Sequence, residues 1–169
     1  MADNVGSPNP EHSDGAASRR GSTIVVGIDG SSAALRALDW AVREGISHGF
    51  EVEVVHVWEN IPLPSAVFTG AEEVRHRSET MLAVQVSTAT RGLTDPPPIS
   101  PVNARGSAAT VLIHRSAGAA MLVLGRSRHH AVMDLFGAVS AGCVRGATCP
   151  VVVVPEPVSR DAEDADDTV

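Results

Sequence analysis

The chain has 169 residues, of which 43% are hydrophobic, and this is enough for one globular domain with a sizeable core. Its formal net charge of −7, from 13 Lys and Arg against 20 Asp and Glu, argues against a surface for nucleic acid or for an anionic membrane. No apolar run approaches the roughly 20 residues that a membrane-spanning helix needs, so we expect neither nucleic acid nor membrane as a partner.

The two ends of the chain differ from its middle in composition. Residues 1–22 are rich in Gly, Ser, Pro and Asp and hold no apolar run of the kind found in signal peptides, so we expect a cytoplasmic protein. Residues 156–169 are acidic and almost free of apolar side chains. Such segments bury too little apolar surface to fold. We therefore predict a disordered tail over 1–22, one domain over 23–155 and an acidic disordered tail over 156–169.

The first part of the domain has the pattern strand, helix, strand. Apolar and mostly β-branched residues fill 23–28, which is typical of a central parallel strand covered on both faces. Residues 29–32 supply turn and capping side chains for a helix whose apolar positions recur at helical spacing as far as Ile46. Gly49 is the stop signal of that helix. Residues 51–58 alternate and then become apolar, which predicts a second strand.

The remainder of the domain adds three strands and three helices. Pro62 and Pro64 exclude a regular helix from the long loop that follows the second strand. A proline near the start of the third strand favours a sheet edge, where a missing N–H does no damage. The predicted elements are a loop over 59–70, a helix over 71–92, a strand over 100–104, a helix over 106–118, a strand over 121–125, a helix from Gly137 and a strand over 151–154.

The stretch 121–154 resembles the carboxyl-terminal signature of the universal stress protein family. That signature is Gly, two residues, Gly, nine residues, Gly and Ser or Thr, followed by a short helix, a pair such as Cys-Pro and a Val-rich strand. The matching residues are Gly125, Gly137, Val139, Ser140, Cys149, Pro150 and Val151–Val154. Two positions differ, because Arg128 stands where the second Gly belongs and Ala138 stands where the first hydroxyl belongs.

Strands that alternate with helices predict an α/β fold, a doubly wound, Rossmann-like, five-stranded parallel sheet with helices on both faces. Right-handed crossovers and the family resemblance give the strand order 3-2-1-4-5. In that order the first and fourth strands are neighbours from opposite windings, so the crevice between them is the topological switch point. Asp29 and Gly125 are expected at its mouth.

The resemblance also implies a ligand. In that family, residues after the first strand and at the end of the second approach adenine and ribose, and the glycine motif holds the phosphates. By position, the adenosine would be framed by Gly27, Ile28, Asp29 and Val57, and the phosphates would lie at Gly125, Gly137, Val139 and Ser140. The resemblance thus implies a stress-response regulator that binds an adenine nucleotide such as ATP, with Mg²⁺ bound only together with the nucleotide.

Several of these residues have a second interpretation. Asp29 either contacts the nucleoside or a bound metal, or caps the first helix, and the two roles are compatible. Ala138 lacks a hydroxyl whose hydrogen bond to a charged group is worth about 1.5 to 3 kcal/mol, and Ser140 either replaces it or lies on the helix surface. Arg126 and Arg128 either point guanidinium groups at a phosphate or form a solvated basic loop.

The sequence gives no support for an enzyme. It has no phosphate-binding Gly-x-x-x-x-Gly-Lys loop, no dinucleotide fingerprint and no nucleophile elbow. His129 and His130 are adjacent on a loop without accompanying ligands, and Cys143 and Cys149 suit buried thiols, so no metal site is expected. The alternative to a nucleotide-binding regulator is a dimeric protein-interaction module that binds no nucleotide, which Ala138 and Arg128 favour.

The last strand predicts an assembly. Val151–Val154 is a flat apolar strand at the expected sheet edge, and such strands are normally covered. The family pairs this strand with its twin across a two-fold axis. We therefore expect a homodimer through Val151–Val154.

Overall fold

The computed structural model describes residues 21–58, 71–126 and 137–156. The predicted loop over 59–70, Arg128 and nearly all of both predicted tails lie outside these residues. In chain order, the elements are β1 (Thr23–Ile28), α2 (Ser32–His48), β2 (Glu51–Trp58), α3 (Ala71–Ala89), β3 (Ile99–Arg105), α4 (Ala108–Arg115), β4 (Met121–Gly125), α5 (Ala138–Gly146) and β5 (Val151–Val154). Among the described residues, no helix has both the length and the apolar content that a membrane crossing demands.

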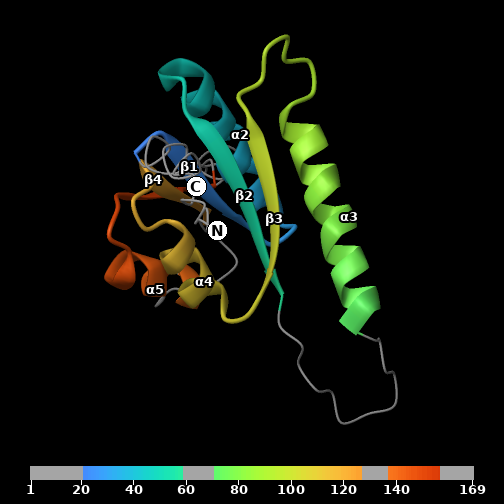
Figure 1. The fold of residues 1–169 in the computed structure, drawn as a ribbon, viewed down its shortest axis with the longest axis vertical. Coiled ribbons are helices and arrows are strands. Elements are labelled where there is room, and N and C mark those ends of the chain that lie inside the picture. Colours follow the sequence, from blue (N-terminus) through green and yellow to red (C-terminus); the bar gives the residue numbers. More distant parts are fainter. Residues whose placement is uncertain (1–20, 59–70, 127–136, 157–169) are drawn as a thin grey trace, which may run out of the picture.

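The strands form one parallel sheet in the order β3-β2-β1-β4-β5, which confirms the predicted fold class and strand order. The helices cover both faces: α2 and α3 lie on one side, and α4 and α5 lie on the other (Figure 1). Side chains that alternate along each strand enter two separate cores. Val52 and Val54 pack beneath α2 and α3, whereas Val55 packs beneath α4 and α5, which is why the central strands are apolar almost throughout.

Two predicted core positions are wrong. Ile46 of α2 is 46% exposed, because the buried face in the last turn of this helix is formed by Gly45, one residue earlier. A Cβ at Gly45 would lie 3.0 Å from the Phe50 carbonyl oxygen, so the helix packs too closely there for a side chain. The helical spacing of Val139 and Cys143 predicts a shared apolar face of α5, yet Val139 is 39% exposed while Cys143 is buried.

The third strand, β3, forms one edge of the sheet and contains Pro101. Val52 N–H donates to the Pro98 carbonyl (2.9 Å) and Gly106 N–H donates to the Trp58 carbonyl (3.1 Å). Because the bonding groups alternate along a parallel strand, the intervening odd-numbered residues of β3 direct their amide positions away from β2. Pro101 is one of these residues, so it removes an N–H from the free edge without breaking the ladder. This confirms the edge position predicted for the proline-containing strand.

Candidate functional site

A cleft of about 430 Å³ opens at the carboxyl ends of β1 and β4, where the strand order reverses. Every sequence-predicted site residue within the described part of the chain lines it. These residues are Gly27, Ile28, Asp29, Val57, Gly125, Arg126, Gly137, Val139 and Ser140. The crossover topology therefore brings together two motifs that lie far apart in the sequence.

The cleft also has lining residues that the sequence reasoning did not single out. They come from the first turn of α2, from β2 and β4, and from the face of α4 that packs on the sheet: Ser31, Ala33, Ala34, Val55, Leu124, Ala108 and Leu112. Six of the seven are apolar, which is the usual signal for core packing, and nothing in their pattern marks them as cleft residues. They give the cleft an apolar wall beside its polar groups.

The amino terminus of α5 is the most polar part of the cleft wall. Gly137 is its N-cap residue and offers no side-chain cap. The first intrahelical bond runs from Ala141 N–H to the Gly137 carbonyl (3.0 Å), so the amides of residues 138–140 have no acceptor within the helix. Since Ala138, Val139 and Ser140 all line the cleft, these donors and the positive end of the helix dipole lie at its wall.

The amino terminus of α2 reaches the same cleft but is already capped. Ser31 is its N-cap residue, and Ser31 Oγ accepts from Ala34 N–H (3.1 Å). Asp29 Oδ1 in turn accepts from Ser31 N–H (2.9 Å). The expectation that Asp29 caps this helix is therefore corrected by one step: Asp29 braces the turn, and Ser31 is the cap. The Asp29 side chain is exposed at the cleft mouth.

Two glycines of the cleft, Gly125 and Gly137, differ in the space that a side chain would have at each position. A Cβ at Gly125 would lie 2.2 Å from the Ala33 carbonyl oxygen and 2.7 Å from Ala34 N, so only glycine lets β4 approach the first turn of α2. Among the described residues, a Cβ at Gly137 would meet nothing within 4 Å, and its φ of −54° and ψ of 158° are open to any residue. Gly125 is required by packing, whereas Gly137 has no such contact with the part of the chain that the structure describes.

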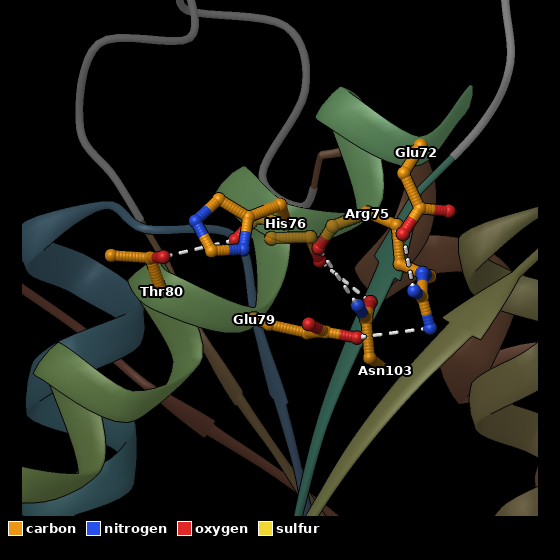
Figure 2. Close-up of polar contacts among 7 residues, drawn as sticks. Glu72, Arg75, His76, Glu79, Thr80 and Asn103 are labelled. Carbon is orange, nitrogen blue, oxygen red and sulfur yellow. Dashed lines mark hydrogen bonds and ion pairs between the residues drawn. The ribbon is translucent and has the colours of Figure 1, made fainter. Parts of the chain in front are cut away.

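A chain of polar contacts, buried only at Ser78, joins β2, α3 and β3 on the side of the sheet that α2 and α3 cover. Ser78 Oγ donates to Asn103 Oδ1 (2.6 Å) and contacts His56 Nδ1. Asn103 Nδ2 donates to the Arg75 carbonyl (3.4 Å), and the Arg75 guanidinium lies between Glu72 and Glu79 (Figure 2). Burial lowers the pKa of His56, against the opposing effects of the Asn103 side chain and the Asp29 charge.

His56 is thus a hydrogen-bonded, half-buried histidine, as its place among apolar residues of the second strand predicts, and it does not line the cleft. The cysteines are free thiols that pack with the α4 and α5 core, and burial raises the pKa of the Cys143 thiol. Within residues 21–58, 71–126 and 137–156, no group of three or more His, Cys, Asp or Glu is placed to hold a metal ion. His129 and His130 lie outside this part of the chain.

Sequence comparison finds relatives along most of the chain. A model of the universal stress protein family matches residues 22–155. The universal stress proteins Rv2623 and Rv3134c of Mycobacterium tuberculosis are 32% identical over 142 residues and 31% identical over 135 residues. The matches cover 78% and 79% of this chain, but 46% and 49% of the relatives. The chain therefore spans about half the length of the curated relatives it matches.

Solved structures share the fold. A universal stress protein in complex with cAMP has a TM-score of 0.62 at 23% identity, with 78% of this chain and 95% of that chain covered. The Archaeoglobus fulgidus universal stress protein in complex with dAMP has a TM-score of 0.58 at 23% identity, with the same coverage, 78% and 95%. A family protein from Arabidopsis thaliana with AMP bound has a TM-score of 0.54 at 18% identity, covering 86% and 97%.

Proposed function

Because the chain belongs to the universal stress protein family, we propose that its cleft binds an adenine nucleotide and that the protein acts by binding rather than by turnover. The observation that carries this proposal is the uncapped start of α5 on a wall of a cleft whose other walls are largely apolar. A phosphate suits the first and a nucleoside suits the second. Three structures of the same fold contain cAMP, dAMP or AMP, which supports the adenine nucleotide class.

The nucleoside is assigned to the end of the cleft formed by β1 and β2. Gly27, Ile28 and Val57 supply apolar surface and backbone groups there. Asp29 is the acidic group at this end, and its exposed carboxylate is suited to accept hydrogen bonds from ribose hydroxyls. A carboxylate repels phosphate, so Asp29 also fixes the direction of the nucleotide in the cleft.

The phosphates are assigned to the end formed by β4 and α5. The amides of residues 138–140 are the donors, with Gly137 leaving space for close approach and Arg126 adding a cation to the lining. Ala138 provides no hydroxyl, and the Ser140 side chain takes that part. ATP with Mg²⁺ is the ligand we propose to test first, and Arg128 is a further candidate phosphate contact that lies outside the described residues.

Calorimetric titration with nucleotide tests the proposal. We expect one site per chain for ATP with Mg²⁺, with a dissociation constant on the order of micromolar. Ala138→Ser restores the missing hydroxyl and should tighten binding about tenfold, because a hydrogen bond to a charged group contributes 1.5 to 3 kcal/mol. Binding by the variant alone would mean that the missing hydroxyl disables an otherwise intact cleft. No heat from either protein would overturn nucleotide binding.

A second candidate function, a dimeric protein-interaction module, is favoured by the free edge of β5. Leu122 N–H donates to the Pro150 carbonyl and Arg126 N–H to the Val154 carbonyl (2.9 Å each), so the amides of Val151 and Val153 face away from β4. Unlike β3, this edge has no proline between its first and last residues. We propose that it pairs with β5 of a second copy.

The choice of a test residue for the dimer follows from the packing of β5. Val152 and Val154 pack on the α2 and α3 core and Val151 on the α4 and α5 core, whereas Val153 belongs to neither core within the described residues. A charge at Val152 would therefore damage the monomer itself. Val153→Asp should give a folded monomer by light scattering, and a Val153→Thr control should stay dimeric. A dimeric Val153→Asp protein would contradict pairing through β5.

A further inference from the structure

The chain leaves β5 beside the phosphate end of the cleft. Arg126 N–H donates to the Val154 carbonyl (2.9 Å), and Arg126 lines the cleft. Two residues beyond Val154, Glu156 Oε1 lies 3.7 Å from Arg36 Nη2 of α2. We use the name exit rim for Arg36, Arg126 and the first turn of α5, residues 138–140. Arg36 lies on the α2 side of the sheet and does not line the cleft, whereas Arg126 and residues 138–140 do, and the chain leaving β5 contacts both Arg126 and Arg36.

Arg36 has hydrogen-bonding capacity that the described residues do not use. Its Nε and Nη2 atoms are buried and have no hydrogen-bond partner in the described structure, and the 3.7 Å contact with Glu156 is too long to be a hydrogen bond. The side chain as a whole is 29% exposed, so a carboxylate can contact its exposed part and reach the two buried nitrogens if the side chain turns outward. A buried donor without a partner is unfavourable by about 1 to 3 kcal/mol, and a carboxylate is the natural complement of a guanidinium.

The segment that follows this point is strongly acidic. Residues 157–169 carry five carboxylates and one arginine, and the carboxylates are Asp161, Glu163, Asp164, Asp166 and Asp167. A chain spans at most about 3.3 to 3.6 Å per residue, so Asp161 can reach up to about 17 Å from Glu156 and the later acids further. The tethered carboxylates therefore have access to the exit rim.

We propose that residues 157–169 dock on the exit rim and compete there with the phosphates of a bound nucleotide. The inference rests on the proposed function, because it assigns a regulator to the same anion-binding end of the cleft. A short flexible tether gives an effective concentration on the order of millimolar, which is enough for weak carboxylate contacts to matter. The tail then lowers the apparent affinity for nucleotide. Salt screens the exposed charges of the tail, so this competition should weaken as the salt concentration rises.

Neutralising the tail without shortening it tests the proposal. In the tail-neutral variant the five carboxylates become amides: Asp161→Asn, Glu163→Gln, Asp164→Asn, Asp166→Asn and Asp167→Asn. At low salt we expect it to bind ATP with Mg²⁺ about two- to tenfold more tightly than the native chain, in proportion to the tethered concentration. At high salt the two affinities should converge, because exposed charges are screened.

A control that neutralises three carboxylates elsewhere separates docking from the general effect of net charge. Glu72→Gln, Glu73→Gln and Glu79→Gln remove exposed carboxylates from α3, none of which lines the cleft. This triple variant should bind ATP as the native chain does. An equal gain in affinity in the α3 variant would overturn docking of the tail, since any loss of negative charge would then be sufficient.

The failure of this inference is distinguishable from the failure of the proposed function. Equal affinities of the native and tail-neutral proteins would overturn tail docking and leave nucleotide binding intact. If neither protein bound ATP, the proposed function would fail. Docking of the tail would then be measured without nucleotide, from the NMR spectra of the N–H groups. We expect the resonances of residues 138–140 and of Arg36 Nε to differ between the two proteins, and identical spectra would overturn docking.

Discussion

The two helices that begin at the cleft, α2 and α5, use the same geometry for different purposes. At α2 side-chain oxygens cap the start, since Ser31 Oγ accepts from Ala34 N–H and Asp29 accepts from Ser31 N–H. At α5, Gly137 offers no side chain and the amides of residues 138–140 have no acceptor in the helix. Both starts line the cleft, but α5 has no side-chain cap to compete with an anion for its first amides.

The contrast extends to the space in front of each start. Gly125 brings β4 against the first turn of α2, where a Cβ would lie 2.2 Å from the Ala33 carbonyl oxygen. At Gly137 a Cβ would meet no atom of residues 21–58, 71–126 or 137–156 within 4 Å. A helix start at the switch point is therefore not a ligand site by its position alone. Such a helix start also has to lack a side-chain cap and a close packing partner. The start of α2 has both, and it forms a wall of the cleft beside the start of α5.

The largest effect is expected from the pair Gly125→Ala and Gly137→Ala. The new methyl at Gly125 collides with backbone atoms of α2, which cannot move without displacing the helix, so we expect a loss of about 3 kcal/mol or more in the free energy of unfolding. The methyl at Gly137 enters open space, and its effect should stay within about 0.5 kcal/mol. Urea unfolding measures both, and similar losses in the two variants would contradict the contrast.

Capping α5 should abolish its advantage. Gly137 has the extended backbone that an N-cap residue needs, so Gly137→Asp supplies a carboxylate that can accept from the free amides. We expect stability to rise by a few tenths of a kcal/mol, and affinity for ATP to fall more than tenfold because of competition and like-charge repulsion. Gly137→Ala is the matched control and retains the amides. Unchanged affinity in Gly137→Asp would place the phosphates elsewhere.

How far the sequence predicts these features depends on how local their causes are. The strands and their order follow from apolar runs and glycine or proline stops, which neighbouring residues determine. The cleft residues follow from topology, because parallel strands end at the same edge. The separation of Gly125 from Gly137 into packing and open space does not follow, since the Ala33 contact joins segments distant in sequence. The choice of Ser31 over Asp29 as the cap was likewise decided by turn geometry.

A smaller effect is expected from opening the start of α2. Ser31→Ala removes the oxygen that accepts from Ala34 N–H, and a lost N-cap costs about 1 kcal/mol of stability. The freed Ala34 amide lies where Gly125 packs closely against α2, so a phosphate has little access to it. Affinity for ATP should therefore change less than threefold. Ser31→Thr retains a capping hydroxyl and serves as the control. A large gain in ATP affinity would show that the closed start of α2 is also a potential anion site.

The smallest effect is a pH dependence on the α2 side. Burial lowers the pKa of His56, whose charged neighbour is Asp29, so the folded state prefers the neutral imidazole. The unfolded chain then binds more protons than the folded chain just below the ordinary histidine pKa of about 6.5, and stability must rise with pH there. The contribution of His56 is present above that pKa and is lost as the pH falls through the lower folded-state value.

His56→Asn retains an N–H donor for Ser78 but does not titrate, so the difference in urea midpoint between native and variant proteins isolates the contribution of the His56 titration. We expect that difference to shrink or reverse in favour of the variant from pH 7.5 to pH 5. A difference independent of pH would contradict the lowered pKa of His56 in the folded protein.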